Sequence, residues 1–445
     1  MSGPGDAPVA IVGGGLAGIA AAVALGEAGC AATLYEARPR LGGATHSFER
    51  GGLTVDNGQH VFLRCCTAYR GLLDRIGGAS RVRVQDRFDV RVLTPAGRSG
   101  RLYRTGLPGP FHLLPALATY SLLPPADRVR AVRGSLALAA LDPANPALDQ
   151  VDLGSWLAAH GQSGPARRAL WELLAVAALN IGVDDAALGP AAKVFQTALL
   201  GRADAADIGV PDAPLGELHG TLAQAAIRRR GGGVHLSAKV TAIEPGPKIV
   251  VNGARIPASA VVVATPHQQA ARLIPHQASP DRDRWDGLDA SPIVNVHAVY
   301  DRPVTDLPFV AVVDSPVQWV FDKSRACGLR DGQYLAVSVS AAERWIDMPA
   351  AKIRAEFVPA LRRLFPLAGL AGLVDFFVTR ERRATFRQSP GSGALRPPAE
   401  TRWPGLYLAG AWTDTGWPDT MEGAVRSGLN AARLVRRHLR RGAVS

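Results

Sequence analysis

The sequence predicts an α/β fold in which a parallel sheet carries α+β inserts, and three observations support this. An apolar run rich in β-branched residues, Val9–Val12, leads through closely spaced glycines into an Ala-rich helical stretch. Two further short strand patterns, Ala260–Ala264 and Gly405–Gly410, lie far along the chain. The segments between them carry helical and strand periodicities of their own. A sheet assembled from separated segments implies that the intervening stretches form inserted lobes.

The first strand and helix enclose glycines at G-x-G-x-x-G spacing. Gly13 allows a tight turn, Gly15 lets a pyrophosphate approach the backbone, and Gly18 lets helix and strand pack closely. The helix is expected over Ile19–Ala28, with Gly29 as its C-cap. Its N-terminus presents free N–H groups and a partial positive charge to phosphates.

An acid closes the second strand of this unit. Glu36 follows Thr33–Tyr35, where its carboxylate would bond ribose hydroxyls and repel a 2′-phosphate, which argues against NADP. The sequence therefore predicts a Rossmann-like dinucleotide site, and the alternative is a glycine-rich turn that binds nothing. In the next stretch, Ala37–Gly43, Arg38 and Arg40 can neutralise a pyrophosphate and a glycine doublet lets a ligand approach the backbone.

A second cofactor segment is expected near the C-terminus, within Gly410–Gly428. Asp419 or Thr420 is a credible N-cap for a helix there. One face of that helix collects the apolar side chains Val425, Leu429, Ala432 and Val435. The helix would aim the amides of Met421 and Glu422 at the pyrimidine edge of a flavin, where its dipole stabilises the anionic reduced ring.

The positive charge of the chain and the distribution of its arginines indicate which classes of binding partner to expect. The net charge is +12 over 445 residues, but the arginines are scattered and no zinc-finger or RNA-binding motif accompanies them. We therefore expect no nucleic-acid partner, and a solvated basic surface drawn to acidic lipid instead. The four cysteines lack metal-binding spacing, and the neighbours Cys65 and Cys66 cannot easily bridge, so neither a metal site nor a disulfide is expected. Residues 1–6 show no basic export signal, which favours the cytoplasm.

Five segments describe the expected domain organisation. The cofactor domain comprises 1–75, 216–275 and 396–445, interrupted by a mainly helical insert at 76–215 and a mixed-sheet insert at 276–395. Leu170–Leu179 is a buried-helix candidate in the first insert. The second insert carries strand patterns at Ile293–Tyr300 and Tyr334–Ser340 and an amphipathic helix at Ala350–Phe365.

One apolar stretch, Phe111–Pro125, is interrupted by prolines and falls short of the ~20 residues that span a bilayer. It is expected to form a pair of helices. The pair lies either at a substrate entrance or on the membrane surface, where it makes peripheral contact, or it is an ordinary helix hairpin in the core.

Taken end to end, the chain resembles the FAD-dependent amine oxidase and carotenoid desaturase superfamily. The resemblance rests on five motifs: Ile11–Gly18, Glu36–Gly43, Asp56–His60, Val261–Pro266, and Leu406–Gly410 through Gly428. Of these, the Asp56–His60 motif favours the squalene-associated branch. The fold implied is a Rossmann-like FAD-binding domain with an inserted substrate domain and a helical lobe.

The resemblance implies FAD as the cofactor and no metal. The implied FAD-binding residues are Gly13, Gly15, Leu16, Ala17, Gly18, Glu36, Ala37, Arg38, Arg40, Gly42, Gly43, Gly58, Gln59, Val240, Gly410 and Met421. Val240 would meet adenine through its backbone, Gly58 and Gln59 would lie near the isoalloxazine, and Met421 would cap its pyrimidine edge. In two places the chain departs from the family: Ala44 stands where arginine is often found, and Ala411 where an aspartate usually bonds the flavin sugar chain. Losing that bond is expected to cost ~1 kcal/mol of FAD binding unless Asp414 or water substitutes.

The implied reaction is reductive dehydroxylation of hydroxysqualene to squalene, as in squalene or hopanoid biosynthesis. Ionisation of the allylic C–O bond would leave a carbocation that takes hydride from reduced FAD, so the site needs an apolar tunnel and a proton donor. His60 is the candidate donor, against a purely structural histidine, with Asp414 and Glu422 as weaker candidates. The expected partners are a lipophilic isoprenoid substrate and an external electron donor for FAD.

Two rival functions stay open. One is a carotenoid or phytoene desaturase, which removes hydride from a polyene precursor. The other is a non-enzymatic prenyl-lipid escort protein that shares the architecture without a flavin. An amine oxidase is less favoured, because no paired aromatic cage for a cationic amine is apparent.

Overall fold

The computed structural model describes residues 7–442. Residues 1–6, on which the expectation of no export signal rests, lie outside the described residues. Within the described part, no helix has both the length and the apolar character needed to cross a membrane.

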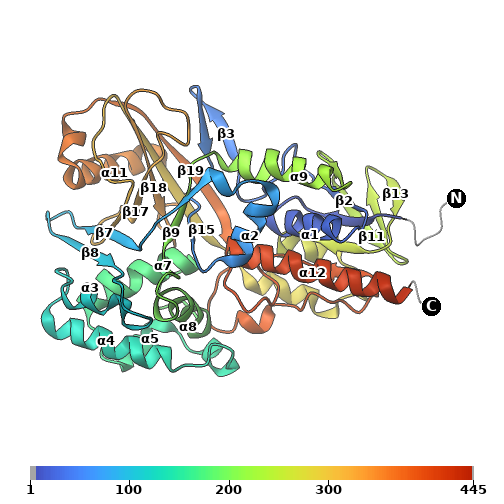
Figure 1. Cartoon of the computed structure of the whole chain (residues 1–445), viewed down its shortest axis with the longest axis horizontal. Coiled ribbons are helices and arrows are strands. Elements are labelled where there is room, and N and C mark those ends of the chain that lie inside the picture. The colour runs from blue at the N-terminus through green and yellow to red at the C-terminus, as the bar shows by residue number, and fades with distance from the viewer. Residues whose placement is uncertain (1–6, 443–445) are drawn as a thin grey trace.

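A five-stranded parallel sheet is assembled from three distant parts of the chain (Figure 1). Its order is β10-β2-β1-β14-β20, and every adjacent pair is parallel. The strands are β1 (Val9–Val12), β2 (Ala32–Tyr35), β10 (Gly233–His235), β14 (Val261–Val263) and β20 (Leu406–Leu408). The prediction that separated segments share one sheet is therefore confirmed.

The two faces of this sheet are covered by different layers. Val9 and Ile11 of β1 pack into a core with helices, whereas Ala10 and Val12 pack into a core with an antiparallel meander. The helices are α1 (Leu16–Glu27), α2 (Thr67–Ile76), α9 (Ala223–Arg229) and α12 (Met421–Gly442). The meander comprises β11 (Val240–Glu244), β12 (Lys248–Val251) and β13 (Ala254–Pro257). The domain is thus a three-layer structure, and the predicted α/β fold is confirmed.

Helix α1 begins earlier than the sequence suggested. It starts at Leu16 rather than Ile19, directly after the glycine-rich turn, and its C-cap is Ala28, with Gly29 following at φ +72°. At the other end of the chain, Val425, Ala432 and Val435 of α12 are buried and Leu429 is partly buried against the same core, which confirms the predicted apolar face.

A second sheet has seven strands in the order β19-β15-β18-β17-β16-β7-β8. Its members are β7 (Asp89–Leu93), β8 (Ser99–Tyr103), β15 (Ser291–Tyr300), β16 (Phe309–Val312), β17 (Trp319–Asp322), β18 (Gln333–Val339) and β19 (Leu373–Thr385). All pairs are antiparallel except β16 with β7. Helix α11 (Ala350–Leu364) packs into the core of this sheet.

The hairpin β7–β8 adds two strands to the insert at 76–215, which the sequence predicts to be mainly helical. These two strands extend the sheet of the other insert. The alternation is visible in the sequence, since Val90 and Val92 are buried and their neighbours are not. Further short strands are β3 (Ser47–Arg50), β4 (Leu53–Asp56), β5 (Phe62–Leu63), β6 (Val82–Val84) and β9 (Ile208–Pro211).

The rest of that insert is helical and encloses its own core. Its helices are α3 (Leu114–Ala118), α4 (Pro125–Ala139), α5 (Leu153–Ala159), α6 (Gly164–Ala166), α7 (Leu173–Leu179) and α8 (Leu188–Phe195). The predicted buried helix at Leu170–Leu179 is confirmed in part, because a π-helical turn, Arg167–Glu172, precedes α7. Elsewhere, α10 (His267–Leu273) follows β14.

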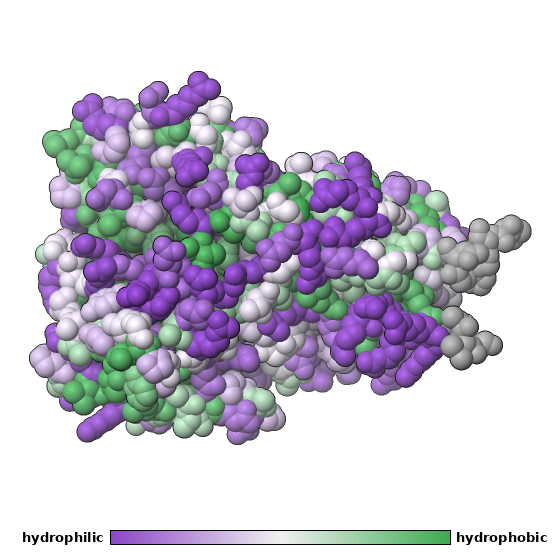
Figure 2. All heavy atoms as spheres, in the orientation of Figure 1, coloured by the Kyte–Doolittle hydropathy of each residue, from purple (hydrophilic) through white to green (hydrophobic). Residues whose placement is uncertain are grey.

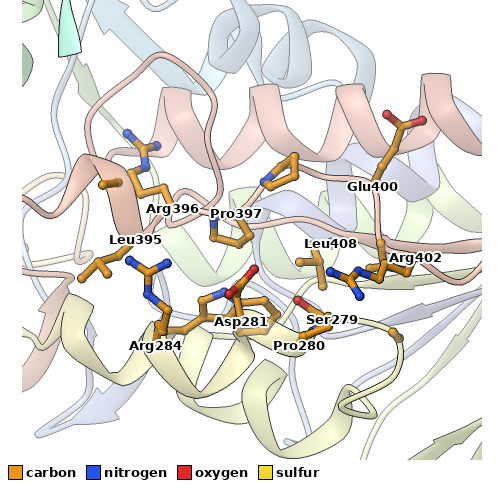
Figure 3. A pocket seen from close by; sticks show the side chains of 15 residues that line it. Ser279, Pro280, Asp281, Arg284, Leu395, Arg396, Pro397, Glu400, Arg402 and Leu408 are labelled. Atoms are coloured by element: carbon orange, nitrogen blue, oxygen red, sulfur yellow. The ribbon is translucent and has the colours of Figure 1, made fainter.

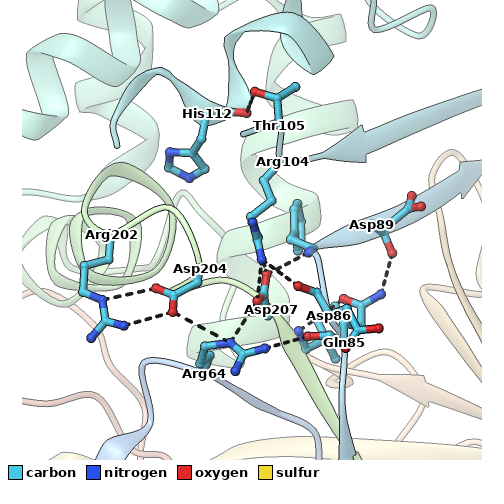
Figure 4. Close-up of polar contacts among 12 residues, drawn as sticks. Arg64, Gln85, Asp86, Asp89, Arg104, Thr105, His112, Arg202, Asp204 and Asp207 are labelled. Carbon is cyan, nitrogen blue, oxygen red and sulfur yellow. Dashed lines mark hydrogen bonds and ion pairs between the residues drawn. The ribbon is translucent and has the colours of Figure 1, made fainter. Parts of the chain in front are cut away.

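A buried carboxylate joins this insert to the cofactor domain (Figure 4). Asp207 is fully buried and accepts hydrogen bonds from Arg64 Nε at 2.9 Å, Arg104 Nε at 2.6 Å and the Phe88 amide at 2.7 Å. Arg64 precedes α2, and Arg104 follows β8. Asp207 therefore ties together three segments that are distant in the sequence.

Candidate active site

The turn between β1 and α1 needs two of its three glycines for packing. Gly13 has φ +109°, and a Cβ on it would lie 2.5 Å from the Ala264 carbonyl oxygen. A Cβ on Gly18 would lie 1.9 Å from the Gly13 carbonyl oxygen. A Cβ on Gly15, by contrast, would meet nothing closer than the Cα of Gly43 at 3.9 Å. Gly15 therefore borders free space at the N-terminus of α1, where a phosphate would lie.

The predicted ribose acid is held beside this turn. Glu36 accepts hydrogen bonds from the Gly14 amide at 2.6 Å and from the Arg38 amide at 2.7 Å. These bonds fix the carboxylate at the carboxyl end of β2 while leaving lone pairs for a ribose. The strand leading to β11 runs alongside, because the Ala238 amide donates to the Glu36 carbonyl. Val240, the predicted adenine contact, begins β11 two residues later and is buried.

The glycine doublet packs directly on the phosphate turn. The Gly42 amide donates to the Gly14 carbonyl, and a Cβ on Gly43 would lie 2.9 Å from the Cα of Gly15. Arg40 Nη1 donates to the Gly43 carbonyl at 3.2 Å, and burial lowers the pKa of this guanidinium. Arg38 and Ala37 are exposed. The structure thus brings the two predicted phosphate segments together.

The start of α12 lies against the same region. Leu16 and Ala17 at the start of α1 are buried, and a Cβ on Gly428 would lie 2.1 Å from the Ala17 carbonyl oxygen, so the two helices pack closely. Thr420 is the cap, since its hydroxyl accepts from the Gly423 amide at 3.2 Å. Gly410 has φ +145° and its amide donates to the Ser427 hydroxyl, which fixes the turn between β20 and α12.

Asp419, the other predicted N-cap of α12, does not cap the helix. Its carboxylate accepts from the Phe386 amide at 2.7 Å, and its own amide donates to Gln388. Burial raises the pKa of Asp419 to about 6, against the opposing effects of the Phe386 bond and of Arg396. A half-buried carboxyl group with a raised pKa therefore sits directly before the residue that caps α12, a feature that the sequence did not reveal.

The two weaker candidates for the proton donor are Glu422 and Asp414. Glu422 is buried, accepts from the Ala68 and Tyr69 amides at 3.1 and 2.7 Å, and pairs with Arg426. It caps α2 and is not free to donate. Asp414 is exposed and accepts from the Gly416 amide.

The Asp56–His60 motif is a buried to half-buried polar segment that contacts the seven-stranded sheet through Asn57. Asp56 pairs with Lys323 at 3.3 Å, and the two side chains are 4 and 5% exposed. Nδ1 of His60 lies 3.1 Å from the Gly58 carbonyl, and burial lowers the pKa of His60. Because a carbonyl only accepts, Nδ1 carries the proton and Nε2 of the neutral ring is a lone pair. In this arrangement His60 can accept a proton at Nε2 but does not supply one.

A hydrogen-bonded histidine that the sequence did not single out is linked to the same polar segment through Thr379. Thr379 donates its hydroxyl proton to the Asn57 carbonyl, so it accepts from His297 Nε2 at 3.0 Å. Nδ1 of His297 then accepts from the Tyr334 hydroxyl at 2.6 Å. Burial lowers the pKa of His297 to about 3, which keeps the ring neutral. This contact spans residues 57 to 379 and has no local sequence signal.

Arg396 is one of the residues that line the pocket in Figure 3, and it also holds the segment before α12. Its guanidinium donates to the carbonyls of Ala411 at 2.9 Å and Thr413 at 2.6 Å. It borders a cavity of about 390 Å³ whose lining also includes Trp285 and Arg402. This cavity contains none of the predicted site residues.

The described residues fit a polar dinucleotide cofactor. Several buried polar atoms among residues 7–442 lack a partner, and they include Gln59 Nε2, Thr265 Oγ1, His46 Nδ1 and Asn295 Oδ1. Gln59 is one of the predicted flavin contacts, and Thr265 directly follows Ala264, against which Gly13 packs. Since buried polar atoms are normally paired, these point to a missing polar ligand. Together with the open space at Gly15, they accommodate the predicted group.

A Rossmann-type sheet, a phosphate turn, a ribose acid and a second helix N-terminus define a flavin-dependent oxidoreductase. The chain belongs to the family of flavin-containing amine oxidoreductases, whose model matches residues 16–436. Its cofactor is FAD, and the class of enzyme is that of the amine oxidases and carotenoid desaturases. This membership favours an enzyme over the escort protein considered from the sequence.

Individual relatives extend over almost the whole chain. The chain is 31% identical to a hydroxysqualene dehydroxylase of Rhodopseudomonas palustris, covering 96% of this chain and 98% of that protein. It is 26% identical to a probable zeta-carotene desaturase of Synechococcus elongatus, with the same coverage. A solved structure of putrescine oxidase superposes with a TM-score of 0.72 at 21% identity, over 97% of this chain and 99% of that one. The structural likeness supports the fold alone.

Proposed function

We propose that this enzyme reductively removes the hydroxyl group of hydroxysqualene to give squalene. The observation that carries the proposal is the end-to-end similarity to proteins named hydroxysqualene dehydroxylase, at 31, 31 and 28% identity over 96% of the chain. The carotene desaturases match over the same span at 25 and 26%. A C30 isoprenoid alcohol is therefore the proposed substrate, and an external donor is proposed to supply electrons.

The proposed reaction breaks the C–O bond of the alcohol. The hydroxyl group takes up a proton and leaves as water, and a hydride takes its place on carbon. Bound FAD in its reduced form supplies that hydride. The protein must then provide a proton donor and exclude water from the reacting carbon.

We propose Asp419 as that donor in preference to His60. Its raised pKa, about 6, keeps a proton on the carboxyl group to a higher pH than an ordinary aspartate. It lies next to Thr420 and Met421, at the predicted flavin edge. His60, in contrast, offers a lone pair at Nε2.

The Asp419→Asn variant tests this assignment. We expect kcat to fall by about 100-fold or more, because general acids contribute on this scale. In the wild type, kcat should fall as pH rises through about 6, because the carboxyl group then loses its proton. The variant should lack that pH dependence while binding FAD normally, as judged by its visible spectrum. The matched variant His60→Gln should lose less than about tenfold, and the reverse ranking would restore His60 as the donor.

Anaerobic turnover distinguishes the proposed reaction from its rival. Protein with chemically reduced FAD is expected to convert hydroxysqualene to squalene, detected as the mass of the lipid product. Oxidised enzyme given phytoene should return it unchanged. Desaturated phytoene together with unchanged hydroxysqualene would instead identify a carotenoid desaturase.

A further inference from the structure

The helical insert carries exposed apolar side chains around helices α3 and α4. Leu107 and Phe111, in the turn before α3, are 45 and 50% exposed. Val129 and Leu136, on α4, are 54 and 56% exposed. In Figure 2, hydrophobic residues gather on this part of the molecule, at the lower left of the view. Exposed apolar side chains that cluster in this way mark interaction surfaces.

Helix α4 carries apolar side chains on its outward face as well as on its inward face. Its inward face is buried through Ala131, Gly134 and Leu138, as expected for a core helix. Its outward face carries Val129 and Leu136, seven residues apart and therefore aligned along the helix. The outward face of α4 thus exposes apolar side chains to water at positions where a surface helix normally carries polar ones.

The same segment is basic. Residues 107–141 contain three arginines and one aspartate. That aspartate, Asp127, is buried and paired with Arg130. Among residues 7–442, no carboxylate pairs with Arg98, Arg128 or Arg133. Arg133 is exposed and lies between Val129 and Leu136 on the outward face of α4.

Internal hydrogen bonds hold this surface in place. Arg128 donates to the carbonyls of Ala118 and Leu123, which ties α4 to the end of α3. The turn that carries Leu107 and Phe111 is closed by the bond from the Thr105 amide to the His112 carbonyl. The Thr105 hydroxyl donates to the same carbonyl (Figure 4). The apolar side chains are therefore presented outward by a fixed backbone.

We infer that this α3–α4 surface, defined by Leu107, Phe111, Val129, Leu136 and the neighbouring arginines, docks the protein on an anionic lipid membrane. Arginines that have no carboxylate partner, beside exposed apolar side chains, match an interface of acidic headgroups over acyl chains. A nucleic-acid surface would need the cations but not the exposed leucine, valine and phenylalanine side chains. The inference is independent of the substrate, since it rests on surface side chains alone.

Vesicle co-sedimentation of the FAD-bound full-length protein tests the inference. We expect the protein to sediment with vesicles of phosphatidylcholine and phosphatidylglycerol, and far less with phosphatidylcholine alone. Raising the salt concentration should weaken binding, because salt screens the headgroup attraction. Equal sedimentation with both vesicle types would overturn the inference.

Two variants separate the apolar and basic contributions. The double variant Leu107→Ser/Phe111→Ser should bind at least about tenfold more weakly, since two inserted side chains are lost. The variant Arg133→Glu should lose at least about fivefold. Because all three residues are exposed, the melting temperature should stay near that of the wild type. If the double variant fails to fold, Val129→Ser/Leu136→Ser takes its place.

A matched control removes apolar side chains elsewhere. Leu370 and Val374, on the other insert, are 77 and 68% exposed. The variant Leu370→Ser/Val374→Ser should bind vesicles as the wild type does, and an equal loss would contradict the assignment to the α3–α4 surface. Duplex DNA serves as a second control. DNA binding that is sensitive to Arg133→Glu, combined with vesicle binding that is unaffected by Leu107→Ser/Phe111→Ser, would identify a polyanion surface and overturn the inference.

Discussion

The Gly15→Ala variant is expected to fold normally and yet to lose FAD. Its new Cβ would lie 3.9 Å from the nearest protein atom, so nothing in the protein resists it. The same methyl group would occupy the space at the start of α1 where the pyrophosphate must approach the backbone. We expect the dissociation constant for FAD to rise at least about 100-fold, which corresponds to about 2.7 kcal/mol. Titration of the apoprotein with FAD, followed by flavin fluorescence, measures this change.

Two other glycines provide controls for that experiment. A Cβ on Gly220 meets nothing within 4 Å, and Gly220→Ala should leave FAD binding unchanged. Gly18→Ala should instead destabilise the fold, because its Cβ would lie 1.9 Å from a backbone oxygen that cannot move away cheaply. If Gly15→Ala purifies with a full complement of FAD, the phosphate does not lie at this turn.

Replacing Asp207 by alanine should lower the free energy of unfolding by about 3–5 kcal/mol. The substitution leaves Arg104, whose side chain is 15% exposed, and Arg64 without their shared carboxylate. It also leaves the Phe88 amide without an acceptor. Buried charges and amides that lose their partners are costly because water cannot replace those partners fully. Denaturant unfolding followed by circular dichroism gives the difference directly.

The neighbouring acid Asp204 provides the matched control. It pairs with Arg202 and lies 4.0 Å from Arg64, and the side chains of Asp204, Arg202 and Arg64 are 35, 79 and 27% exposed. Asp204→Ala should cost less than about 1 kcal/mol, as is usual for surface ion pairs. Similar losses for Asp204→Ala and Asp207→Ala would contradict the role of burial in this junction.

Features that depend on nearby residues could be predicted from the sequence. The phosphate turn and Glu36 belong to one strand–helix–strand unit, so spacing alone places Glu36 beside Gly14. The apolar face of α12 follows from helical periodicity in the same way. Because each of these arises within a few tens of residues, the sequence contains all the information that is needed.

Features that join distant segments could not be predicted in this way. The bond between Asp419 and the Phe386 amide, and the pairing of Asp56 with Lys323, depend on how the two sheets meet. Polar residues such as Asp207 look like surface residues until the chain has folded around them. The alternation of apolar and polar residues in β7 and β8 is visible in the sequence, but it lies within a segment whose helical pattern is stronger.

The parallel pairing of β16 with β7 has a consequence for dividing this protein into parts. It joins Ala311 and Val312 of one insert to Val92 and Leu93 of the other. Excising either insert would expose an edge of the sheet with unpaired backbone amides, and such exposed edges promote aggregation. The two inserts are therefore inseparable in fragment design, although the chain sequence presents them as separate modules.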